Sequence, residues 1–257
     1  MACAGPLSAA RPSFSVGAAP LLQRGPRPGE RPQPPEQRQI EAMFDGIVPH
    51  YDLLNGLMAL GQDRRWRRLT LGAIASAPPG PVLDLGCGTG ALAQGLAGRR
   101  QVVGIDVSAE MLRTAQARLA GQAALVRGSA FALPFGARAF SALVSGFVLR
   151  NLDQLDTAFA EAARVLRPGG VVALLDATLP RHPLVLPLFE LYFGRLPPLL
   201  GSLVGRREAY RYLVRSLAHL PPPAELCSRL ERAGFVRCRY QSLLLGTVTL
   251  FTAARPA

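Results

Sequence analysis

Residues 82–90, Val-Leu-Asp-Leu-Gly-Cys-Gly-Thr-Gly, place an acid two residues before three glycines at alternate positions. Glycine tolerates positive φ and has no Cβ, so this turn can bring its backbone against a ligand. The apolar residues around Asp84 predict a strand before the turn, and residues 91–96 predict a helix after it. The N-terminal amides of that helix would face the ligand, which favours a site for a polar small molecule.

A second apolar run follows the loop and ends in Asp106. At the tip of a neighbouring strand, this carboxylate is placed to accept hydrogen bonds from two ribose hydroxyls. The glycines follow G-x-G-x-G, which differs from the G-x-G-x-x-G of dinucleotide binders. A plain tight turn would explain the glycines but not the acid. The loop resembles the S-adenosylmethionine (SAM) loop of Rossmann-like methyltransferases, and this resemblance implies SAM as cofactor.

Apolar runs alternate with helical periodicity after residue 80, which predicts a parallel sheet with helices on both faces. The predicted strands are 81–85, 101–106, 123–127, 140–146 and 170–175, and the helices are 90–97, 108–119 and 154–166. A helix over 224–233 and a hairpin of strands 235–241 and 246–254, turning at Gly246, would complete the sheet. We therefore expect an α/β fold of the Rossmann-like class I methyltransferase type. Its seven-stranded sheet should be mostly parallel, with an antiparallel terminal strand.

The remaining segments surround this core within one domain of residues 39–257. Helical periodicity over 39–77 predicts N-terminal helices, one of them at 64–75. Residues 1–38 are rich in Pro and Arg, which predicts a disordered tail. An organelle transit peptide remains the alternative, because the tail contains no acid before Glu30.

Residues 179–215 interrupt the alternation with an apolar insertion. Prolines recur through residues 179–205, so we expect this stretch not to form one straight helix. Two interpretations stay open: a helical cover for the edge of the sheet, and a lid or groove that receives a greasy substrate.

Composition narrows the chemistry further. All 29 basic residues are arginine, which excludes a lysine Schiff base and a lysine-dependent phosphate loop. The net charge of +12 suits an anionic membrane surface, whereas no nucleic-acid-binding module is recognisable. The four cysteines lack C-x-x-C spacing, so we expect reduced thiols, no metal site and a cytoplasmic location. No apolar run reaches the roughly 20 residues of a membrane span.

Beyond the glycine loop, four segments resemble the ubiquinone/menaquinone biosynthesis C-methyltransferases of the UbiE/MenG type. They are residues 44–55 (FDGIVPHYDLLN), 63–68 (DRRWRR), 147–152 (FVLRNL) and 209–217 (AYRYLVRSL). The resemblance covers residues 41 to 255. It implies methylation of a ring carbon on a polyprenyl quinol, either demethylmenaquinol or a 2-polyprenyl-benzoquinol.

The same resemblance implies roles for individual residues. Arg150 would stabilise the phenolate, Asn151 would hold the substrate hydroxyl or a water, and Tyr51 would close over the cofactor. Asp52 or His50 is an alternative base. The expected cofactor-binding residues are Asp84, Gly86, Gly88, Thr89, Gly90, Asp106, Met111, Ser129, Ala130 and Gly146.

Three positions depart from the family pattern. Ser129 replaces an acid or amide near the adenine, Val148 replaces a glycine, and Asp176-Ala-Thr178 replaces Glu-x-Ser. These departures keep open a methyltransferase acting on another lipophilic phenol or a secondary metabolite. A domain that binds SAM without catalysis, as a regulator, is a further alternative.

A prenylated quinol resides in the bilayer. We therefore expect transient contact with the anionic inner face of the membrane, through the basic surface and the apolar insertion. The sequence is also compatible with a homodimer.

Overall fold

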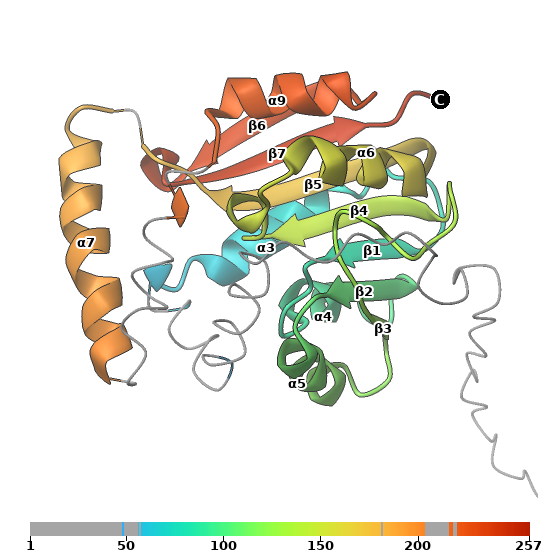
Figure 1. The fold of residues 1–257 in the computed structure, drawn as a ribbon, viewed down its shortest axis with the longest axis horizontal. Helices are drawn as coiled ribbons and strands as arrows, with labels where there is room; N and C mark the ends of the chain where they lie inside the picture. The colour runs from blue at the N-terminus through green and yellow to red at the C-terminus, as the bar shows by residue number, and fades with distance from the viewer. Residues whose placement is uncertain (1–47, 49–55, 57, 181, 204–215, 218–219) are drawn as a thin grey trace, which may run out of the picture.

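The computed structural model describes residues 48, 56, 58–180, 182–203, 216–217 and 220–257. Within this part, seven strands form one sheet in the order β3-β2-β1-β4-β5-β7-β6 (Figure 1). The strands are β1 (Val82–Leu85), β2 (Val102–Asp106), β3 (Ala124–Arg127), β4 (Phe140–Gly146), β5 (Leu166–Ala177), β6 (Val236–Leu243) and β7 (Val248–Ala254). Strands β1 to β5 pair in parallel, and β7 is antiparallel to both of its neighbours. The predicted fold class is confirmed.

Helices cover both faces of this sheet. They are α3 (Asp63–Ala73), α4 (Ala91–Leu96), α5 (Ala109–Leu119), α6 (Leu155–Val165), α7 (Val185–Leu203) and α9 (Pro223–Arg232), with 3₁₀ turns η1 (Leu149–Asn151) and η3 (Leu244–Gly246). Side chains alternate along each strand, so Val82 packs into the layer under α3, α4 and α5, whereas Leu83 packs into the layer under α6 and α9. The two apolar layers hold the carboxyl ends of β1, β2, β4 and β5 at one edge.

Strand β5 begins earlier than predicted. The sequence Arg167-Pro-Gly-Gly170 lies within this strand, although its proline and glycines predict a stop before a strand starting at 170. The pairing with β4 shifts register between Phe140 and Ala142, and Gly169 has a φ of +71°. The strand thus accommodates these residues as an irregularity near its start.

Helix α7 corrects the prediction for the apolar insertion. Residues 185–203 form one continuous helix, which Figure 1 shows beyond the carboxyl ends of the parallel strands, beside the β6–β7 hairpin tip. Pro187 lies in the first turn, where its missing N–H has no helical acceptor. Pro197 and Pro198 remove two donors, but the helical φ of proline lets the helix continue. None of the helices in the described ranges is long and apolar enough to cross a bilayer.

The cysteine prediction was also wrong in part. Cys227 on α9 and Cys238 on β6 form a disulfide, with their Cα atoms 5.6 Å apart. Their sequence separation of 11 carries no motif, and only the packing of α9 on β6 brings them to bonding distance. Cys87 is a free, buried thiol.

Several predictions lie outside the described residues. These are the tail of residues 1–38, most of the helices predicted over 39–57, and the lid residues 204–215. Helix α3 (Asp63–Ala73) confirms the helix predicted over 64–75, with bounds one residue earlier at its start and two residues earlier at its end.

Candidate active site

The glycine loop leaves β1 and enters α4 through three left-handed residues. Gly86, Gly88 and Gly90 have φ values of +65°, +52° and +80°, which side chains rarely adopt. Gly90 is the N-cap of α4. A Cβ added at Gly88 would meet no atom nearer than Met111 Sδ at 4.0 Å, so the loop backbone borders open space there.

Asp84 lies beneath this loop and fastens it. Its Oδ2 accepts a hydrogen bond of 3.0 Å from the Ala93 amide in α4. The side chain is 1% exposed, and its Oδ1 has no hydrogen-bond partner among the described residues. Burial raises the pKa of Asp84 to about 7, against the lowering effects of the Ala93 amide and the Arg67 charge.

This buried acid predicts a pH-dependent stability. Because the pKa of Asp84 is higher in the folded than in the unfolded protein, protonation of Asp84 favours the folded state. This contribution is fully present below about pH 4 and is lost as the pH rises to 7. Asp84→Asn keeps the acceptor for Ala93 and removes the ionisation. As the pH rises from 5 to 8, the unfolding free energy of the variant should increase by roughly 2 to 3 kcal/mol relative to that of the wild type. Urea unfolding of both proteins at the two pH values measures this gain, and an identical pH dependence would refute it.

Asp106 joins the tips of β1 and β2. Its Oδ2 accepts a 2.8 Å hydrogen bond from the Gly88 amide, and its Oδ1 accepts one of 2.9 Å from Ser108. Ser108 Oγ in turn accepts from Met111 N at 3.0 Å, so Ser108 caps the N-terminus of α5. Carboxylate oxygens have several acceptor positions, so Asp106 retains capacity for hydroxyl donors.

A cleft of about 100 Å³ opens between the loop, Asp106 and the end of β4. The predicted residues that line it are Gly86, Gly88, Asp106, Met111, Ala130, Gly146 and Asn151. Val148, which was identified only as a departure from the family pattern, also lines the cleft. It packs over Gly86 so closely that a Cβ at that glycine would clash with it.

Three other predicted residues surround the cleft without lining it. Thr89 Oγ1 accepts a hydrogen bond from Arg118 at 2.9 Å. Gly90 packs on α5, and Ser129 Oγ accepts from the Phe131 amide at 3.2 Å. The structure thus brings these predicted residues together around the cleft, but only some of them line the open space.

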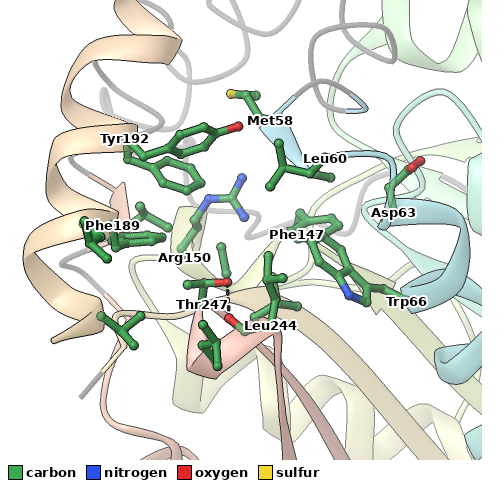
Figure 2. Close-up of a pocket in the computed structure, with 18 of the residues that line it drawn as sticks. Met58, Leu60, Asp63, Trp66, Phe147, Arg150, Phe189, Tyr192, Leu244 and Thr247 are labelled. Atoms are coloured by element: carbon green, nitrogen blue, oxygen red, sulfur yellow. Dashed lines mark hydrogen bonds between the residues drawn. The ribbon is translucent and has the colours of Figure 1, made fainter. Parts of the chain in front are cut away.

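A second cavity, of about 410 Å³, lies between α3, α7 and the β6–β7 hairpin tip (Figure 2). Its lining is mainly apolar and includes Met58, Leu60, Trp66, Phe147, Val185, Leu188, Phe189, Tyr192, Phe193, Leu217, Leu244, Leu245 and Val248. The Arg150 guanidinium points into this space. Among the described lining residues, Phe147 alone borders both this cavity and the cleft.

Arg150 is held in the wall of the large cavity by Asp176. Its Nη1 lies 2.5 Å from Asp176 Oδ1, and its backbone amide donates to Asp176 Oδ2 at 3.2 Å. The two side chains are 8% and 0% exposed. The guanidinium carbon lies 5.7 Å from the centre of the Phe147 ring, and Nε has no hydrogen-bond partner in the described part.

Sequence reasoning missed the role of Asp176, which it identified only as a departure from the family pattern. Asp176 is the penultimate residue of β5, the strand that neighbours β4, and Arg150 follows β4. The sequence could have indicated this ion pair, because it places an acid near the carboxyl end of one predicted strand and the predicted catalytic arginine after the neighbouring strand.

Of the other two predicted catalytic residues, the structure describes Asn151 alone. Asn151 lines the small cleft instead of the Arg150 cavity, and its Nδ2 donates to Phe147 O at 3.4 Å. Its Oδ1 is buried without a hydrogen-bond partner in the described part. Tyr51, and with it His50 and Asp52, lies outside the described residues.

Thiol and metal chemistry find no support in the part of the chain that the structure describes. Burial raises the pKa of the Cys87 thiol well above its usual range, so the thiol stays protonated. The same residues contain no group of three His, Cys, Asp or Glu side chains arranged to hold a metal ion.

Comparison with known proteins gives consistent results. The profile of the ubiE/COQ5 methyltransferase family matches residues 33–255. Demethylmenaquinone methyltransferase of Roseiflexus castenholzii is 40% identical over 234 residues, covering 86% of this chain and 96% of its own. The UbiE C-methyltransferase of Syntrophotalea carbinolica is 37% identical over 235 residues, covering 89% and 96%.

Solved structures agree on the fold. Phosphoethanolamine N-methyltransferase 2 of Haemonchus contortus, in complex with SAM, aligns with a TM-score of 0.61 and 15% identity over 83% of this chain and 57% of its own. A SAM-dependent methyltransferase of Thermotoga maritima aligns with a TM-score of 0.60 and 18% identity over 84% and 99%.

Proposed function

The chain belongs to the ubiE/COQ5 methyltransferase family, and from that membership we propose that it methylates a ring carbon of a polyprenyl quinol with SAM. The quinol would be demethylmenaquinol or a 2-polyprenyl-benzoquinol. The observation that carries this proposal is the meeting, at Phe147, of a small cleft that contains the Asp106 carboxylate and a large apolar cavity.

The small cleft fits the cofactor. The ribose hydroxyls of a nucleoside could donate hydrogen bonds to the Asp106 carboxylate. The open space beside Gly88 would let the nucleoside approach the loop backbone closely. When bound, SAM supplies an electrophilic methyl group on a sulfonium. Asn151, with a buried Oδ1 free of hydrogen bonds in the described part, is placed to accept a hydrogen bond from a ligand in this cleft.

The large cavity fits the acceptor. Its aromatic and aliphatic walls suit a quinol ring with its prenyl chain. A quinol carbon becomes nucleophilic when the neighbouring hydroxyl loses its proton. Arg150 keeps its charge at all working pH values, so it favours the phenolate but is a poor base.

Asp176 orients that arginine. Its two oxygens accept hydrogen bonds from the side chain and the backbone amide of Arg150, while the buried Nε has no hydrogen-bond partner in the described part of the chain. The proton of the hydroxyl and, later, that of the ring carbon would pass to water or to a base outside the described residues.

Incubation with labelled SAM and a reduced membrane quinone extract tests the proposal. Mass analysis should reveal a labelled quinol heavier by one methylene, and the oxidised extract, which lacks the phenol, should give no product. A soluble phenol methylated faster than the prenylated quinol would select the alternative substrate class.

We also propose that the protein meets its substrate at the anionic inner face of the membrane, from the cytoplasm. The net charge of +12 and the apolar insertion support this location.

A further inference from the structure

Exposed apolar side chains gather around the mouth of the large cavity. In the described part, nine large hydrophobic side chains are exposed, and seven of them come from three neighbouring segments. These are Leu60 before α3, Leu184, Leu188 and Leu191 at α7, and Leu179, Leu244 and Leu245 at the hairpin tip. Leu60, Leu188, Leu244 and Leu245 also line the cavity, so the three segments form one continuous rim. A contiguous apolar surface of this kind marks an interaction site.

Helix α7 is apolar on two sides. Val185, Phe189 and Tyr192 follow helical spacing and line the cavity. Leu184, Leu188 and Leu191 follow the same spacing beside this stripe and are 74%, 67% and 50% exposed. Leu188 also borders the cavity, whereas Leu184 and Leu191 do not and form the outer face. The helical turn already begins at His182, whose carbonyl accepts from Val185 and Leu186 at 3.0 Å. Since one apolar face suffices to line the cavity, the outer face requires an apolar partner of its own.

The backbone holds part of the rim in a strained conformation. Leu60, Leu244 and Leu245 have φ values of +50°, +42° and +57°, in the left-handed region that disfavours side chains. Residues in this region persist only where the surrounding structure holds them, and they cluster at functional sites. The strain at Leu245 leaves its side chain 75% exposed at the hairpin tip, so this conformation does not serve the protein core.

We propose that this rim, with the outer face of α7, docks on an anionic lipid bilayer, so that a lipophilic ligand passes from the membrane directly into the cavity. The inference rests on the proposed function for the identity of that ligand. The cavity opens at the same surface, and Arg195 continues the outer stripe one turn after Leu191, where it meets lipid phosphates. The net charge of +12 favours an anionic surface and opposes pairing with a second copy.

The test removes exposed leucines that do not line the cavity. Leu184→Gln/Leu191→Gln changes the outer face of α7, and Val236→Gln/Tyr240→Gln removes two exposed apolar side chains from β6 as a matched control. Binding to vesicles of equal parts phosphatidylcholine and phosphatidylglycerol should weaken about tenfold or more in the first variant only. Methylation of vesicle-embedded polyprenyl quinol should fall with it, whereas methylation of a short-chain quinol in buffer should stay at the wild-type rate.

Unchanged vesicle binding in the first variant would overturn the inference. So would loss of a dimer in sedimentation velocity with vesicle binding intact, since a second copy would then cover the face. Failure of the proposed function is distinguishable: wild-type protein would methylate neither quinol, while its vesicle binding would still depend on the leucines.

Discussion

Arg150→Ala is expected to lower kcat roughly 10²- to 10³-fold while the dissociation constant for SAM stays near the wild-type value. A donor aimed at developing negative charge in a buried site contributes this much to catalysis. Arg150 meets that description, because it is 9% exposed, charged, and directed into the apolar cavity instead of the cofactor cleft. Steady-state kinetics with a quinol and calorimetry with SAM separate the two effects.

Stability requires a control, because Arg150→Ala leaves Asp176 buried without its partner, which is strongly destabilising. Arg150→Lys retains a positive charge to pair with Asp176 but loses the planar guanidinium and its paired N–H donors. This variant should therefore fold, with an activity between those of Arg150→Ala and the wild type. Arg229→Ala, which removes an arginine from an exposed ion pair on α9, should leave kcat unchanged. Equal losses of turnover and SAM affinity in Arg150→Ala would contradict the assigned role.

Asp106→Ala is expected to weaken SAM binding roughly 100-fold. The substitution removes acceptors for two ribose hydroxyls, and hydrogen bonds to charged groups contribute about 1.5 to 3 kcal/mol each. It also frees the Gly88 amide, which Asp106 holds at 2.8 Å. Isothermal titration of SAM into the purified protein measures the loss.

Asp106→Asn preserves one acceptor oxygen and should bind SAM with intermediate affinity. Asp156→Ala, at an exposed acid on α6, should bind SAM as wild type does. Undiminished binding by Asp106→Ala would refute the placement of the ribose, and with it the interpretation of the glycine loop.

The sequence predicted that the glycine loop and Asp106 lie together, because the determinants of this arrangement are local. Asp84, the glycines and Asp106 lie within 23 residues, on consecutive strands that pair in parallel. Strand ends of parallel neighbours meet at one edge, so spacing alone brings Gly88 and Asp106 together.

What the sequence did not predict depends on contacts between distant segments. Asp176 and Arg150 are 26 residues apart, and only the pairing of β5 with β4 makes them partners. The Cys227–Cys238 disulfide likewise depends on the packing of a helix on a strand. The expectation that prolines would prevent one straight helix over 179–205 was also wrong for residues 185–203, which form the single helix α7.

The division between the two cavities has a kinetic consequence. One aromatic ring, Phe147, is the described boundary that they share, so under the proposed function the nucleoside and the lipophilic acceptor would occupy separate chambers. Neither ligand would have to leave its chamber before the other enters, which corresponds to a random order of addition. The spent nucleoside could then be exchanged from the aqueous side while the enzyme stays adsorbed on lipid, and many acceptors could be processed in one residence.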